Sequence, residues 1–198
     1  NHPDTNEFTL KVIETAPKWG GWREVKTARI LQSLELFREG EFGEGLRLLY
    51  GHVREADESD YTIAKIKARL ALVEALITAG DYEGAKRFLR EVGDIQVSVQ
   101  HSSVKYLQSY SELLWARASL MQPGPRDRYW EILDRLEILL AVIAKYARPP
   151  GPAPYWLIIG ATQERLEQFE QAVRSFRKAR DDAKKQGSLF YSAQASLA

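Results

Sequence analysis

The strongest constraint on the fold of this chain is a small set of residues that recurs, with the same internal spacing, further along the sequence. The set consists of a glycine, an aromatic residue two positions later, and a small residue three positions after that. It occurs at Gly40, Phe42 and Gly45, and again at Gly80, Tyr82 and Ala85. Apolar residues recur at helical intervals on both sides of each glycine. Coinciding offsets of this kind indicate an internal repeat whose unit is a pair of helices joined by a tight turn.

The aromatic position continues through the second half of the chain. Tyr129 comes somewhat later than the step from Phe42 to Tyr82 would place it, and Phe169 then follows Tyr129 at the same step as before. We interpret the longer step as a local insertion. The spacing predicts four helix pairs, at about 23–56, 59–92, 101–147 and 154–186, followed by a terminal helix at 188–198. Gly93 is expected to end the second pair, and 94–103 fits either an extended connector or a helix start.

An N-terminal helix is expected before these pairs, capped by Asp4 or Thr5 and ending near Thr15, because Pro17 follows. Two indoles come next, at Trp19 and Trp22. Single tryptophans usually serve packing. We therefore expect both rings to cover the open end of the first pair.

The fourth pair carries the most specific residues. Its first helix contains Trp156, Ile159 and Gly160, and its second contains Ala172 and Phe176. This order resembles the tetratricopeptide pattern W-x-x-L-G…A-x-x-x-F, and the interval between the tryptophan and the alanine is the family's own. The resemblance implies an all-α fold: a single domain, 1–198, built as an α-solenoid (a right-handed superhelix) of about four helix pairs plus a terminal helix. In such arrays neighbouring pairs bury each other.

The step from Gly40 to Gly80 is longer than the period of roughly 34 residues that is usual for the family. Long repeats of this kind resemble bacterial helical sensor regions, found in large ATP-dependent transcription activators and in peptide-responsive regulators. The family's clamp for acidic chain ends uses Lys and Asn side chains. Here the only asparagines are Asn1 and Asn6, in the leading segment, so recognition of chaperone tails is not expected.

The overall charge excludes some classes of partner. Lys and Arg number 28 against 27 Asp and Glu, so no large field of one sign favours nucleic acid or an anionic membrane. Direct contact with nucleic acid is therefore not expected. The longest apolar run is far shorter than a membrane span. The chain has no cysteine, which fits a reducing compartment, and the cytoplasm is the expected location. Because position 1 is Asn and the only methionine is Met121, we expect a fragment of a longer product.

Residues with typical catalytic spacing are missing from the sequence. The three histidines, His2, His52 and His101, have no partner at metal or relay spacing, and no glycine-rich phosphate loop exists. Acidic pairs such as Glu55/Glu58 are interpreted as solvated faces. We therefore predict no enzymatic activity, no metal and no cofactor.

Binding residues are expected on the first helix of each pair, because in tetratricopeptide arrays these helices line a concave groove. The polar or aromatic candidates on these helices are Lys67, Glu74, Tyr106, Tyr110, Arg117, Glu164 and Arg165. Tyr106, Tyr110 and Arg117 are spaced by four and then seven residues, so they share one helix face. A structural role, in which the tyrosines only bridge neighbouring pairs, is the alternative interpretation.

We therefore predict a scaffold that binds a protein or peptide segment, or another domain of its own protein, through the concave face of the array. The alternative is a ligand- or peptide-sensing domain of a bacterial transcription regulator. A fold alone does not decide between these functions.

Overall fold

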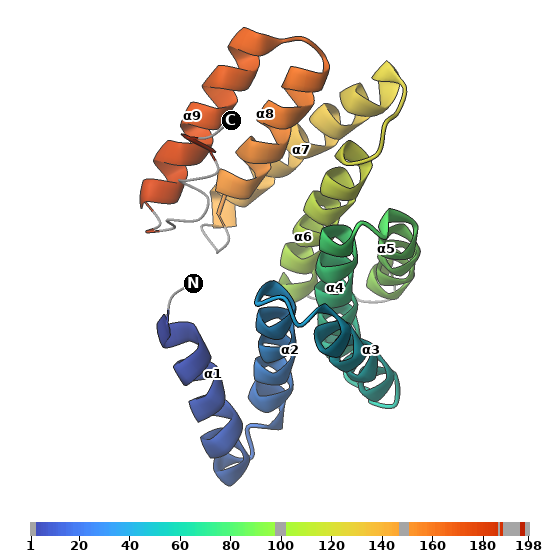
Figure 1. Cartoon of the computed structure of the whole chain (residues 1–198), viewed down its shortest axis with the longest axis vertical. Coiled ribbons are helices and arrows are strands. Elements are labelled where there is room, and N and C mark those ends of the chain that lie inside the picture. The colour runs from blue at the N-terminus through green and yellow to red at the C-terminus, as the bar shows by residue number, and fades with distance from the viewer. Residues whose placement is uncertain (1–2, 98–101, 147–150, 186, 188–194, 197–198) are drawn as a thin grey trace. The chain divides into compact units, whose positions relative to one another are not determined.

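The computed structural model of the chain describes residues 3–97, 102–146, 151–185, 187 and 195–196. In these residues the protein is all-α, with nine α-helices, one short 3-10 helix and no strand, which confirms the predicted all-α class. The elements are α1 (Pro3–Thr15), η1 (Ala16–Trp19), α2 (Trp22–Arg38), α3 (Phe42–Asp57), α4 (Thr62–Ala79), α5 (Tyr82–Val97), α6 (Ser102–Leu120), α7 (Arg126–Tyr146), α8 (Ala153–Arg165) and α9 (Phe169–Lys185) (Figure 1).

The helices form two compact units, Asn1–Gln108 and Ser109–Ala198. Unit 1 contains α1 to α5, unit 2 contains α7 to α9, and the division falls inside α6. This point lies within the third predicted helix pair. Assembly of all four pairs into one continuous array stays a prediction.

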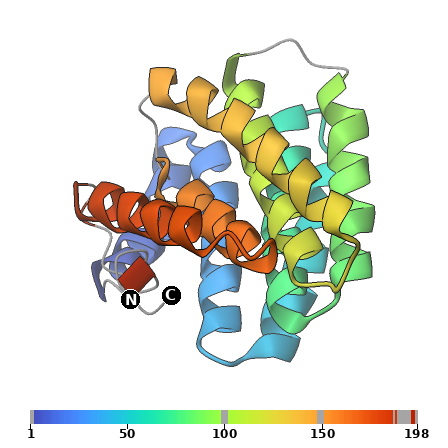
Figure 2. The same cartoon turned by 90° about the horizontal axis from the view of Figure 1, so that it is seen from above.

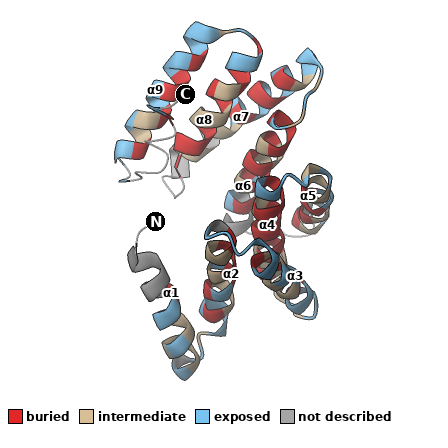
Figure 3. Ribbon diagram, in the orientation of Figure 1, coloured by how far each residue is buried: buried red, intermediate tan, exposed pale blue. Residues whose placement is uncertain are grey.

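Helix α4 is the centre of unit 1. It packs against α2, α3 and α5, and α1 packs against α2. Side chains such as Ile66, Leu72 and Val73 have no exposed surface, so α4 is buried on most of its sides (Figure 3). A helix that is apolar nearly all round can only be stable when neighbours cover it, and the α3 and α5 helices supply that cover.

Three of the hairpins turn in the same way. A residue one or two positions after the end of the first helix has a left-handed backbone, with φ of 101° at Gly40, 82° at Gly80 and 64° at Glu167. In each turn the next amide donates to the carbonyl five residues back, at 2.9 to 3.0 Å, which satisfies a helix-terminal acceptor. The aromatic that opens the second helix follows two residues after the left-handed position. The spacing read from the sequence therefore reflects one repeated turn.

Small residues bring the two helices of a pair into close contact. A Cβ atom added at Gly160 would lie 2.6 Å from Cε1 of Phe176, and one added at Gly45 would lie 2.9 Å from Cβ of Phe37. Ala85 and Ala172, the small residues of the second and fourth pairs, are 0% and 3% exposed. Gly160 therefore marks a close crossing of α8 and α9.

The core of unit 2 joins α6, α7 and α8. It includes Ile132, Leu136, Tyr155 and Ile159, which are all almost fully buried. Helix α8 packs against α7 on one side and against α9 on the other (Figures 1 and 2). Ile132 fills the position that holds a small residue in the other pairs, so this pair uses a bulky side chain at its centre.

Two expectations about local structure were wrong. Helix α5 continues through Gly93 to Val97, because Val92 and Gln96 are buried and their packing outweighs the roughly 1 kcal/mol cost of a glycine inside a helix. Trp22 does not cover the end of a helix pair, since 61% of it is exposed at the start of α2. Helix α6 begins at Ser102, whereas 98–101 and most of the predicted terminal helix 188–198 lie outside the described residues.

Candidate functional site

The seven predicted binding residues lie on α4, α6 and α8, which are the first helices of their pairs. Lys67 and Glu74 are on α4, Tyr106, Tyr110 and Arg117 on α6, and Glu164 and Arg165 on α8. The first three belong to unit 1 and the other four to unit 2. The structure therefore places them in two sets, one in each unit.

In unit 1, two of the predicted residues lie on α4 and one lies on α6. Lys67 and Glu74 are both half-buried, and they are seven residues, or about two turns, apart on α4. The Lys67 ammonium group has no ion-pair or hydrogen-bond partner among the described residues. Tyr106, near the start of α6, is 37% exposed. Each side chain thus keeps some surface available to a partner.

In unit 2 the predicted tyrosine and arginine of α6 differ in their surroundings. Tyr110 packs against the buried core cluster of α6, α7 and α8, which favours the structural interpretation of this ring. Arg117 is half-buried, and no carboxylate of the described residues pairs with its guanidinium group. Of the two, Arg117 is the better candidate for contact with a partner.

The remaining predicted residues, Glu164 and Arg165, are exposed at the C-terminal end of α8. Arg165 lies in the last turn of the helix, where the helix dipole favours a cation without any ligand. Both side chains are accessible, but nothing in their surroundings favours binding over a solvated helix end.

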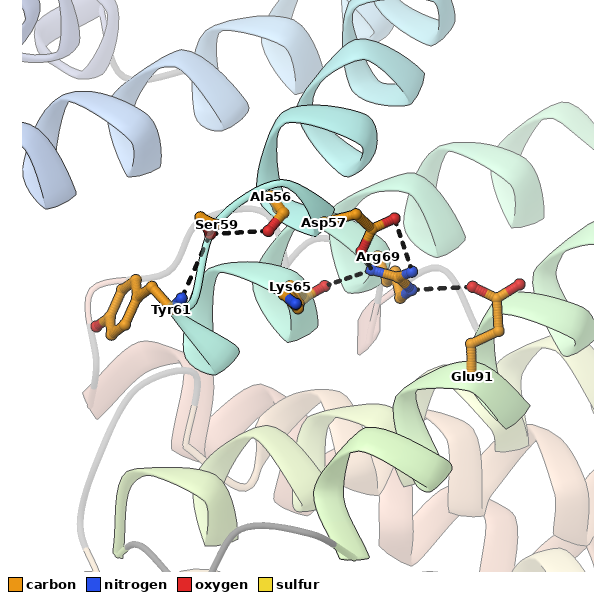
Figure 4. Close-up of polar contacts among 7 residues, drawn as sticks. All are labelled: Ala56, Asp57, Ser59, Tyr61, Lys65, Arg69 and Glu91. Atoms are coloured by element: carbon orange, nitrogen blue, oxygen red, sulfur yellow. Dashed lines mark hydrogen bonds and ion pairs between the residues drawn. The ribbon is translucent and has the colours of Figure 1, made fainter.

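A polar cluster around Arg69 lies in unit 1 and was not predicted. Arg69 of α4 donates from Nη1 and Nη2 to the two carboxylate oxygens of Asp57, at 2.9 and 3.1 Å. Its Nε donates to Glu91 of α5 at 2.9 Å (Figure 4). The guanidinium group also donates to the Lys65 carbonyl at 3.4 Å. One side chain therefore ties the end of α3 to α5 across α4.

The environment of Arg69 keeps it charged. Its side chain is only 10% exposed, and burial alone lowers the pKa of the guanidinium group, but the hydrogen bonds to Asp57 and Glu91 outweigh burial and raise that pKa. With its donors committed inside the protein, Arg69 has a structural role. A single arginine between Ala68 and Leu70 in an apolar helix was the signal that sequence reasoning overlooked.

A second unpredicted cluster joins α2 and α3 around His52. Ser33 Oγ donates its only proton to the Arg29 carbonyl at 2.9 Å. Since that proton is used, the neutral His52 ring donates from Nε2 to Ser33 Oγ, 3.1 Å away. Nδ1 lies 3.9 Å from the Glu55 carboxylate, which also pairs with Lys26 at 3.3 Å. Burial lowers the pKa of His52, and the opposing effect of Glu55 does not cancel it.

These groups border a small cavity, lined by Lys26, Ile30, His52, Glu55, Ala56 and Ala64. Its volume is about 10 Å³, which is room for about one water molecule. Pockets for small molecules measure roughly 300–1,000 Å³. The cavity therefore cannot serve as the ligand pocket of a sensor domain.

The described residues also lack the features of a metal site and of a membrane-spanning helix. The described residues contain no group of three or more His, Asp or Glu side chains that could hold a metal ion. None of the described helices has the length and apolar character needed to cross a bilayer.

Comparison with known proteins adds no family assignment. No family model matches the chain, and no curated protein matches it.

Proposed function

We propose that this protein is a non-enzymatic interaction scaffold, a tetratricopeptide-like array that binds a protein or peptide segment, or another domain of its own protein, through its first helices. The proposal rests on the local geometry of the hairpins. Three share one left-handed turn, and close packing at small residues holds their helices together. Helix pairs built alike in this way can stack into an α-solenoid, in which the first helices lie along one face.

The observation that carries the proposal is the state of two cations on first helices. Lys67 of α4 and Arg117 of α6 are half-buried, yet neither has a carboxylate partner among the described residues. Removing a charge from water costs free energy unless an opposite charge compensates. Arg69, by contrast, has two carboxylates. A partner that supplies acidic groups would complete the environment of Lys67 and Arg117.

The expected partner segment combines acidic and apolar side chains. A carboxylate of the segment would pair with the cation of the unit that it contacts, Lys67 in unit 1 or Arg117 in unit 2, and a guanidinium group can bind a carboxylate through two parallel hydrogen bonds. Apolar side chains would pack beside the exposed edge of Tyr106. A helical segment presents such groups at i, i+3, i+4 and i+7 spacing, so it can lay one face along a groove.

The test uses fluorescent peptides with leucine and glutamate at that helical spacing, titrated with the full chain. We expect measurable binding that Arg117→Ala weakens about tenfold, because a charged hydrogen-bonded contact is lost. Arg90→Ala, at an exposed arginine of the second helix α5, is the matched control. Equal binding by the two variants would reject the first-helix surface, and a melting temperature that drops with Arg117→Ala would assign the residue to packing.

A further inference from the structure

Helix α7 carries an exposed face that is both apolar and acidic. Trp130 is 43% exposed and Ile138 is 69% exposed, although both are large apolar residues. Asp134 lies between them, one turn from each, and Asp127 lies seven residues earlier on the same face. Neither carboxylate has a partner among the described residues. We call this surface, Asp127, Trp130, Asp134 and Ile138, the α7 stripe.

Helix α9 carries an exposed face on which basic residues (Arg174, Arg177 and Lys184) outnumber acidic ones (Glu170 and Asp181). Phe169 is 62% exposed and Val173 is 47% exposed. Arg177 and Lys184 continue the same face toward the end of the helix, both exposed and both without a carboxylate partner among the described residues. We call this surface, Phe169, Val173, Arg177 and Lys184, the α9 stripe. Unit 2 therefore carries one acidic and one basic stripe, and both stripes include apolar side chains.

We propose that the α7 stripe of one molecule packs antiparallel against the α9 stripe of a second copy of this chain. Both stripes are exposed in the described part of the single molecule, so a second molecule can reach them. Charge complementarity selects the partner, since an acidic stripe fits a basic one. The proposal concerns second helices and does not depend on binding by the first helices.

The register of the two helices supports the pairing. In an antiparallel pair, a step of four residues along one helix is matched by four residues back along the other. With Ile138 opposite Val173, Asp134 comes to lie opposite Arg177. A further seven residues place Asp127 opposite Lys184. One apolar contact and two opposite-charge contacts thus arise from a single register.

Residues beside the two stripes add to their charges. Glu131 and Glu137 lie on either side of the α7 stripe, and Arg174 and Arg180 lie on either side of the α9 stripe. Among the described residues Arg174 pairs with Glu170 of its own helix, at 3.4 Å, and both side chains are at least 70% exposed. Such a surface pair contributes little stability, so Arg174 can exchange it for a contact with a second molecule.

A charge-swap experiment tests the pairing by sedimentation velocity of the full chain over a range of protein concentrations. We expect the unaltered chain to associate, and to associate less as the salt concentration rises from about 0.05 M to about 0.5 M, because exposed charges are screened. Asp134→Arg or Arg177→Asp alone should raise the concentration needed for half-association about tenfold, since each places like charges face to face. The double variant carrying both changes should associate again.

Arg90→Asp provides the matched control, since it alters the net charge as Arg177→Asp does but lies on α5 of the other unit. It should leave association unchanged. A chain that stays monomeric at all concentrations would overturn the proposal. So would association that survives the single changes, or that the double variant fails to recover. Circular dichroism of each variant checks that the exposed substitutions leave the helices intact.

Discussion

The hairpins α4–α5 and α8–α9 share the same left-handed turn but are held together by different means. In α4–α5, in unit 1, Arg69 donates hydrogen bonds to carboxylates of α3 and α5 from a nearly buried position. In α8–α9, in unit 2, the ring of Phe176 lies directly on Gly160. A buried hydrogen bond from Ser175 to Gln163, 2.8 Å long, accompanies that contact.

This comparison shows which features recur from one helix pair to the next and which do not. The turn and the small residue at the crossing, Ala85 in one hairpin and Ala172 in the other, are common to both. The two pairs differ in further contacts, which are the charged hydrogen bonds of Arg69 in α4–α5 and the Gly160–Phe176 contact with the Ser175–Gln163 hydrogen bond in α8–α9. A repeat of this kind is therefore defined by backbone geometry, while side chains are free to differ.

The largest effect is expected from a change at the close contact between Gly160 and Phe176. Gly160→Leu should destabilise the protein by about 3 kcal/mol or more, because even its Cβ would lie 2.6 Å from the ring of Phe176 and the ring is enclosed. Thermal or urea unfolding measures the change. Gly51→Ala, inside α3 with no atom within 4 Å of the added Cβ, is the control and should stabilise slightly. Equal effects at the two glycines would contradict the close crossing.

The charge-based contact should be the next most sensitive. Arg69→Met should lower the free energy of unfolding by about 2 kcal/mol, because the carboxylates of Asp57 and Glu91 would lose the cation that they share. Arg69→Lys should not restore the loss, since an ammonium group cannot reproduce the planar fork that meets both carboxylates. The same unfolding measurement on Arg47→Met, which breaks an exposed pair with Glu44, should show no change.

The sequence predicted the repeated features better than the singular ones. Gly40, Gly80 and the aromatics two positions later were found from spacing alone, because the same turn recurs in both helix pairs. The contacts of Arg69 were not predictable, since Asp57 and Glu91 lie 12 and 22 residues away on other helices. Periodicity places a residue on a helix face but does not say which helix covers that face.

The candidate site was predicted only in part, for a similar reason. Spacing placed Tyr110 and Arg117 on α6, but only the fold separates a ring that packs on the core from a half-buried cation. The fourth helix pair was predicted, but the left-handed backbone of Glu167 was not, because that conformation usually requires glycine and this hairpin has none there.

A smaller effect sharpens the comparison of the turns. Glu167→Gly should stabilise the protein by about 0.5–1 kcal/mol, because glycine adopts the left-handed conformation without steric cost, as Gly40 and Gly80 do in the other hairpins. Chemical denaturation would detect the shift in midpoint. A loss of stability would mean that the Glu167 side chain makes a contact of its own.

The smallest expected effect concerns the buried histidine of unit 1. Because the folded state lowers the pKa of His52 below 6.5, its neutral form is favoured, and the resulting stability is present above pH 6.5 and lost as the pH falls below it. His52→Gln retains a donor for Ser33 but does not titrate. Between pH 7 and pH 5, the melting temperature of the unaltered protein should fall more than that of the variant. Parallel curves would show that the ring does not contribute.

The central claim, that first helices form the binding surface, is tested most directly by photo-crosslinking. A benzophenone-bearing residue is placed singly at Thr78, Tyr106 or Arg165, exposed positions on first helices that leave Lys67 and Arg117 in place, and at Arg54 or Arg90 on the second helices α3 and α5. Each full-length variant is then irradiated with the fluorescent acidic peptides. We expect crosslinked peptide from the first-helix positions and little from the second-helix positions. Crosslinking mainly from Arg54 and Arg90, or equally from all five, would contradict it.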